Sequence, residues 1–135
     1  MTKSEVREKV FLLLFRAEFH DEEEYKEQLK LFVEEEVEEA PAFLSKEEYI
    51  TSKFKDICAH LPEIDALIDE KSDGWKTSRM SKMDLTIIRL DDYEMKYEED
   101  IPSKVSINEA VELAKKYGTD DSPAFVNGIL AKLYE

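Results

Sequence analysis

Four residues near the N-terminus combine positive charge with aromatic rings at four-residue steps: Lys3, Arg7, Phe11 and Phe15. Residues four apart lie on one face of a helix, so the sequence predicts two cations followed by two rings along a single ridge. Such a ridge can bind single-stranded nucleic acid, because cations hold phosphates and rings stack on bases. The alternative is that Phe11 and Phe15 are core residues, and the N-terminal segment taken alone favours that alternative.

Residues suited to catalysis or metal binding are few and scattered. His20 and His60 are far apart in the chain, and the sequence has no HExxH, CxxC, GxGxxG, P-loop or GxSxG motif. It also lacks the Glu-x-x-His step typical of di-iron helical bundles. The single cysteine, Cys58, has apolar neighbours at helical spacing, whereas a catalytic thiolate needs an exposed, electropositive setting. We therefore expect no enzymatic activity, no cofactor and no metal site.

The cysteine count and the hydropathy indicate the compartment. One thiol cannot form an internal disulfide, which fits a reducing environment. No apolar run approaches the ~18 residues of a membrane span, and the N-terminal segment lacks the apolar core of a signal peptide. We expect a cytoplasmic protein that does not contact membranes.

Charge is unevenly distributed along the chain. Its 33 acidic and 19 basic residues give a formal net charge of -14, which by itself opposes contact with nucleic acid. Residues 1–17 and 74–90 nevertheless sum to +5, whereas residues 18–39 sum to -9. The acidic charge is therefore concentrated away from two locally basic stretches.

Helices are the elements expected to position these residues. Apolar residues recur with a helical period, only three Gly and four Pro interrupt the 135 residues, and no segment alternates for long as a strand would. We predict six or seven helices and no strand. The first is expected at about residues 4–19 with Ser4 as its N-cap, and Leu61-Pro62 is expected to kink or break the third.

Caps and turns mark the ends of several predicted helices. The helix that starts near Ser81 has the widest apolar face and is expected to lie at the centre. Asp73-Gly74 is a turn signal and the predicted boundary between subdomains of about 1–72 and 75–135 within one domain. Three pairs have the spacing of a capped helix start: Ser45 with Glu48, Ser81 with Asp84, and Ser106 with Glu109.

The second half of the chain carries a longer pattern. It starts at Trp75 and Arg79 and continues with IIRL at 87–90, YEM at 93–95, INEAVELAK at 107–115, YG at 117–118 and FVNGIL at 125–130. In order and spacing this pattern resembles the NusB family of bacterial transcription antitermination factors. The likeness is strongest over about the last 60 residues, and Arg7-Glu8 is its clear anchor in the first half.

The resemblance implies an all-α fold of two small helical bundles and a role in binding RNA during transcription. Family members bind the boxA element of ribosomal RNA leader transcripts together with NusE, a ribosomal small-subunit protein. They do so in a complex on RNA polymerase that suppresses premature termination. The family's RNA contacts correspond here to the N-terminal helix and to the start of the last helix, near Asp121, Ser122 and Phe125.

The chain departs from the family pattern at both places. Ser4, Glu5 and Val6 stand where relatives often carry several arginines, and Ala124 stands where a lysine usually precedes the phenylalanine. Fewer phosphate contacts mean a weaker, less salt-dependent affinity. From the four-residue ridge and the resemblance together, we predict that Lys3 and Arg7 are the residues of this chain that hold phosphates.

The same hypothesis assigns base stacking to Phe15 together with Phe11. An alternative of another class is an acidic adaptor for NusE with little RNA affinity of its own. A third is the RNA-binding module of a ribosomal RNA methyltransferase, which the absence of a glycine-rich cofactor segment disfavours. The choice between a monomer and a homodimer stays open.

Overall fold

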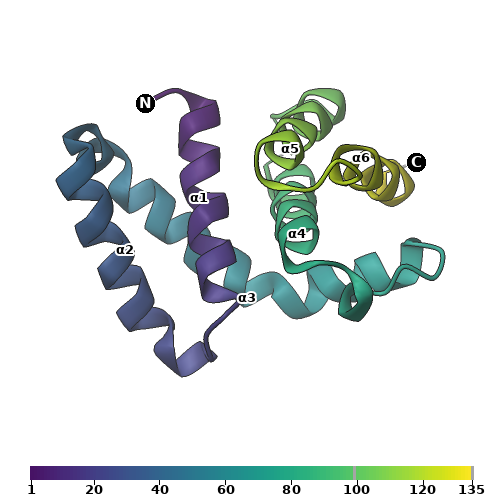
Figure 1. Ribbon diagram of the computed structural model, residues 1–135, viewed down its shortest axis with the longest axis horizontal. Coiled ribbons are helices and arrows are strands. Elements are labelled where there is room, and N and C mark those ends of the chain that lie inside the picture. Colours follow the sequence, from purple (N-terminus) through teal and green to yellow (C-terminus); the bar gives the residue numbers. More distant parts are fainter. Residues whose placement is uncertain (99, 135) are drawn as a thin grey trace. The chain divides into compact units, whose positions relative to one another are not determined.

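The computed structural model describes residues 1–98 and 100–134, which form helices joined by short connections (Figure 1). The α-helices are α1 (Lys3–Ala17), α2 (Tyr25–Glu39), α3 (Glu47–Lys71), α4 (Lys82–Tyr97), α5 (Ser103–Tyr117) and α6 (Ser122–Leu133). Short 3-10 helices cover Glu22–Glu24, Pro41–Lys46 and Thr77–Arg79. The described residues contain no strand, so the predicted all-α class is confirmed.

The helices belong to two compact units, Met1–Cys58 (unit 1) and Ala59–Glu135 (unit 2). The division lies inside α3 and not at the predicted position, Asp73-Gly74, although that turn is present with φ angles of 53° and 92°. α3 runs through Pro62 without a break. Pro62 has no N–H to bond the carbonyl of Cys58, so the missing backbone hydrogen bond of α3 falls where the two units divide.

Unit 1 consists of α1, α2 and the first half of α3. α1 and α2 lie side by side and run in opposite directions (Figure 1). Phe32 of α2 and Phe43 of the following 3-10 helix are buried and meet edge to face, with ring centroids 6.1 Å apart. Tyr25 contacts Phe54 of α3 at the same centroid distance. Aromatic pairs therefore join α2 to the 3-10 helix Pro41–Lys46 and to α3.

The predicted helix starts agree with the structure in one case and differ in others. The Ser81 hydroxyl accepts the backbone N–H of Asp84 at 3.1 Å, which confirms that cap. α1 starts earlier than predicted, because Thr2 and not Ser4 is its N-cap and exchanges two hydrogen bonds with Glu5. α3 starts at Glu47, and the Ser45 hydroxyl instead donates to the carbonyl of Ala42.

Ser106 is the clearest case in which a local pattern was misleading. α5 starts at Ser103, so Ser106 lies inside the helix and does not cap it. Its side chain is fully buried, and its hydroxyl donates to Oδ1 of Asp91 on α4. A capping box requires the serine side chain to face its own helix start, whereas tertiary packing turns this one towards α4.

α4 contacts both α5 and α6 and is the central helix of unit 2, as its wide apolar face predicted. It also buries three acids: Asp91, Asp92 and Glu94. The Tyr134 hydroxyl donates to Oδ1 and to the carbonyl of Asp92, but Oδ2 of Asp92 is buried without a hydrogen-bond partner among the described residues. Burial raises the pKa of the Asp92 carboxyl, and the Tyr134 bond lowers it in part.

We expect Asp92→Asn to make the protein more stable relative to the wild type as the pH rises from about 4 to 7. An unfolded aspartate has a pKa of about 3.9. Because the folded pKa is higher, the wild type loses stability as the pH rises through it, and asparagine has no proton to lose. Urea unfolding of both proteins at several pH values measures the difference.

Tyr134→Phe is the control for this pH dependence. It removes the donor that lowers the pKa of Asp92, so the pH-dependent loss of stability becomes steeper. A constant stability difference between Asp92→Asn and the wild type across this pH range would contradict the prediction.

Candidate nucleic-acid interface

The N-terminal half of α1 carries the predicted phosphate-binding cations. The Thr2–Glu5 capping box fixes the start of the helix and makes Lys3 its first residue. Lys3 is exposed, and Arg7, one turn further on, is partly exposed. Hydrogen bonds from Thr2 lower the pKa of the Glu5 carboxyl, so this acid stays ionised in the cap. The two cations therefore lie on the surface of α1 near its N-terminus.

The other two cations of α1 are engaged by α2. Lys9 Nζ lies 2.7 Å from Oε2 of Glu36. Arg16 donates to Oε1 of Gln28 at 2.8 Å and to Oε2 of Glu35 at 3.0 Å. The locally basic charge of residues 1–17 is thus partly neutralised by the acidic helix beside it. That reduces the positive potential available to a phosphate chain.

Three rings follow one another along α1 and the turn just beyond its end, and their exposure increases in order. Phe11 is fully buried, Phe15 is half-buried, and Phe19 has 57% of its surface exposed. The ring centroids of Phe11 and Phe15 are 6.1 Å apart, and those of Phe15 and Phe19 are 5.0 Å apart. Phe11 therefore fits the core alternative, because a buried ring offers no face to a base. Phe19 was not among the predicted site residues, although it continues the same four-residue step beyond the end of α1.

The start of α6 carries the other predicted residues. Asp121 is exposed and precedes the helix, and Ser122 is its first residue. The Ser122 hydroxyl is buried and accepts the backbone N–H of Thr119 at 3.0 Å. Phe125 is half-buried, and its ring meets that of Trp75 at 5.1 Å and 77°. Ser122 thus stabilises the α5–α6 connection, whereas Asp121 and Phe125 have exposed surface.

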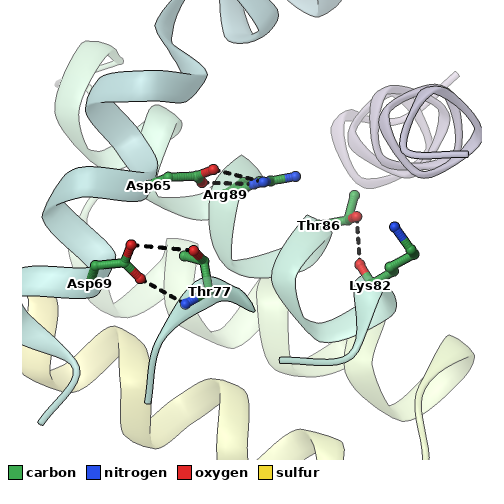
Figure 2. Close-up of polar contacts among 6 residues, drawn as sticks. All are labelled: Asp65, Asp69, Thr77, Lys82, Thr86 and Arg89. Carbon is green, nitrogen blue, oxygen red and sulfur yellow. Dashed lines mark hydrogen bonds and ion pairs between the residues drawn. The ribbon is translucent and has the colours of Figure 1, made fainter. Parts of the chain in front are cut away.

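The second basic stretch, residues 74–90, is also partly engaged within its own unit. Arg89 makes two hydrogen bonds to Asp65 of α3, at 2.8 and 2.7 Å (Figure 2). Lys76 donates to the carbonyl of Asp69 at 3.1 Å. The carboxylate of Asp69 accepts the backbone N–H of Thr77 at 2.7 Å and its hydroxyl at 3.4 Å (Figure 2). These bonds attach the segment between α3 and α4 to α3.

Other kinds of site are not found in the described part of the chain. Residues 1–98 and 100–134 contain no group of three or more His, Cys, Asp or Glu side chains placed to hold a metal ion. No described helix has the length and apolar character needed to cross a membrane.

Comparisons with known proteins are consistent along the whole chain. Residues 4–135 match the NusB family. The chain is 59% identical to the transcription antitermination protein NusB of Agathobacter rectalis, with 98% of each protein covered. It is 45% identical to that of Lachnoclostridium phytofermentans, with both fully covered.

Solved structures give the same result for the fold. T. maritima NusB superposes with a TM-score of 0.84 at 34% identity, covering 98% of this chain and 90% of that one. A chain in the crystal structure of a plectonemic RNA supercoil superposes with a TM-score of 0.80 at 25% identity, covering 98% and 93%.

Proposed function

Because this chain belongs to the NusB family, we propose that it is a transcription antitermination factor that binds RNA. The family match over residues 4–135 is the observation that carries this proposal. The RNA is the boxA element of ribosomal RNA leader transcripts, bound together with NusE in a complex on RNA polymerase. Bacterial transcription takes place in the cytoplasm, which is the compartment we propose. The role is non-enzymatic and needs no cofactor.

The structure supports different roles for the proposed RNA-binding residues, some contacting phosphates and others contacting bases. Lys3 and Arg7 lie on the surface of α1 and are assigned to phosphates. Phe15 in unit 1 and Phe125 in unit 2 have ring surface available to unstacked bases. Asp121 precedes α6, the helix that carries Phe125, and its carboxylate can accept hydrogen bonds from base amino groups. Phe11 is left out because it is buried.

We expect the affinity of the protein alone for RNA to be weak. The net charge is -14, and Lys9 and Arg16 are already bound to side chains of α2. The two surface cations of α1 release few counterions from an RNA strand, which limits the electrostatic part of the affinity at this helix. NusE, bound at the same time, supplies the remaining contacts.

Lys3→Ala combined with Arg7→Ala is expected to weaken binding of boxA RNA about tenfold at low salt. Each lost phosphate contact on a single strand lowers the slope of log affinity against log salt by about 0.7, so the double variant loses about 1.4. Anisotropy of labelled boxA RNA, titrated with and without NusE at about 50 and 200 mM salt, measures both quantities.

Lys26→Ala combined with Lys30→Ala is the matched control. These two exposed lysines lie on acidic α2, so their removal changes the net charge equally without touching α1. We expect a smaller loss of affinity and an unchanged slope. Equal effects of the two double variants would show that total charge and not the α1 cations decides binding. No binding by the wild type, with or without NusE, would refute the RNA-binding function.

A second candidate is an adaptor whose acidic surface binds basic NusE and contributes little RNA contact itself. The exposed acids of α2, including Glu34, Glu38 and Glu39, favour it. This adaptor is expected to bind RNA only when NusE is present, and the Lys3 and Arg7 substitutions should have no effect on that binding. Its affinity for NusE should fall steeply as the salt concentration rises. NusE affinity that salt leaves unchanged would exclude this electrostatic adaptor.

Self-association would regulate RNA binding under either candidate function. A homodimer that covers the α1 cations would compete with RNA and act as an off-state. Sedimentation with and without RNA distinguishes the cases, because a protein that is monomeric throughout has no such state.

A further inference from the structure

We propose that Trp75 and Phe125 together form a base-stacking contact for single-stranded RNA in unit 2. This inference rests on the proposed RNA-binding function. The two rings meet edge to face, 5.1 Å between centroids and 77° between planes. Half of the surface of Trp75 is exposed, and Phe125 is partly exposed. The pair thus leaves half of the Trp75 surface open to solvent while the indole is in contact with a second ring.

The backbone on the N-terminal side of Trp75 is held in a defined turn. Asp73 and Gly74 have φ angles of 53° and 92°, in the left-handed region. The backbone N–H of Trp75 donates to the carbonyl of Ser72 at 3.3 Å, and the buried Ser72 hydroxyl donates to the carbonyl of Trp75 at 2.6 Å. Lys132 of α6 lies 3.3 Å from the carboxylate of Asp73. The turn is therefore tied to the helix that carries Phe125.

The C-terminal side of Trp75 is held as well. Asp69 of α3 accepts the backbone N–H of Thr77 (Figure 2). The carbonyl of Asp69 accepts a hydrogen bond from Lys76 Nζ. A ring whose backbone is fixed on both sides loses little conformational entropy when a base stacks on it. This rigidity distinguishes Trp75 from an exposed hydrophobic side chain on a free loop.

Local charge favours RNA over a protein partner as the occupant of this ring pair. Residues 74–83 contain Lys76, Arg79 and Lys82 and no acid, in a chain whose net charge is -14. Arg79 is exposed, and Lys76 donates to a neutral carbonyl, so its positive charge is retained. A strand with phosphates near residues 76–82 and a base on Trp75 uses both features.

The acids beside Phe125 are consistent with a strand whose phosphates lie near residues 76–82. Asp120 and Asp121 are exposed at the α5–α6 connection, where they repel phosphates. The Phe125 side of the pair is therefore expected to face bases and not the backbone of the strand. The contact thus has a direction, with phosphates on the Trp75 side and base edges on the Phe125 side.

Trp75 is the single tryptophan of the chain, so its own fluorescence reports the contact. We expect boxA RNA, added to the full chain alone or saturated with NusE, to quench this emission with the same midpoint as the anisotropy of labelled RNA. Trp75→Leu should weaken RNA binding about tenfold, the range typical for loss of one stacked base. Trp75→Phe keeps a ring and should retain most of the affinity.

Two further variants separate stacking from charge and from general loss of structure. Arg79→Ala should lower the salt slope, whereas Trp75→Leu should leave it unchanged. Tyr97→Leu removes another exposed ring of unit 2 and should leave RNA affinity as in the wild type. Circular dichroism and urea unfolding confirm that each variant is folded before its affinity is compared.

Three results would overturn the proposal. If the wild type binds labelled RNA but its tryptophan emission is unchanged and Trp75→Leu binds equally well, the ring pair is no RNA contact, while the proposed function stands. If NusE alone quenches the emission and RNA adds nothing, the pair binds protein. If the wild type binds no RNA under any condition, both the proposal and the proposed function fail.

Discussion

Replacing Phe11 by alanine is expected to lower the free energy of unfolding by about 3–5 kcal/mol, the range for deleting a fully buried aromatic ring. The Phe11 side chain has no exposed surface, and its ring lies 6.1 Å from that of Phe15. Small proteins are stable by only about 5–15 kcal/mol, so the loss is a large part of the total. Urea unfolding followed by far-ultraviolet circular dichroism measures it.

Phe15→Ala is the matched comparison, because Phe15 stands one turn away on the same helix and is only half-buried. We expect it to cost less stability than Phe11→Ala but to weaken RNA binding. Phe11→Leu, which keeps most of the buried volume, should bind RNA like the wild type. If Phe11→Leu lost RNA affinity while staying folded, or if Phe11→Ala cost under about 1 kcal/mol, the assignment of Phe11 to the core would be wrong.

Gly118→Ala is expected to cost about 2–4 kcal/mol. An added Cβ would lie 2.5 Å from Cβ of Ser122 and 2.8 Å from the carbonyl oxygen of Ala114, so both chain segments would have to move. Overpacking of this kind costs about 1–3 kcal/mol, and losing the Ser122 bond to Thr119 adds about 1 kcal/mol. The displaced Ser122 is the first residue of α6, which carries Phe125. We therefore expect RNA binding near Phe125 to weaken too.

Gly128→Ala is the control for this substitution. Gly128 lies inside α6, is exposed, and an added Cβ would meet nothing within 4 Å. Alanine is favoured over glycine in a helix, so this change should stabilise the protein by about 1 kcal/mol. Urea midpoints of the two variants should thus shift in opposite directions. A shift in the same direction would show that steric contact at Gly118 is not the deciding factor.

The internal ion pairs change how the charge pattern is interpreted. Four basic residues between 1 and 17 suggested a cationic helix, yet Lys9 and Arg16 are bound to α2. In residues 74–90, Arg89 is bound to Asp65, whereas Lys76 donates to a neutral carbonyl of α3 and keeps its charge. The surface available to a phosphate chain is therefore less basic than the local sums indicate. This supports weak, partner-assisted binding.

The sequence predicted best the features that depend on neighbouring residues. The Ser81 cap and the wide apolar face of α4 both follow from residues within a few positions of one another. The same approach failed at Ser106, where the pattern of a capping box was present but Asp91 of another helix is the hydrogen-bond partner. A local pattern cannot reveal a distant partner that competes for the same side chain.

The four-residue ridge also shows which features the sequence determines and which depend on tertiary packing. The sequence by itself determined the all-α class, the family and the alignment of Lys3, Arg7, Phe11 and Phe15 on one face of α1, because helical period and motif spacing are local properties. Only the tertiary structure decided that Phe11 is buried. It also brought Trp75 into contact with Phe125, which follows far along the chain. Burial and long-range contacts depend on which helix faces pack together, and the helical period alone does not specify that.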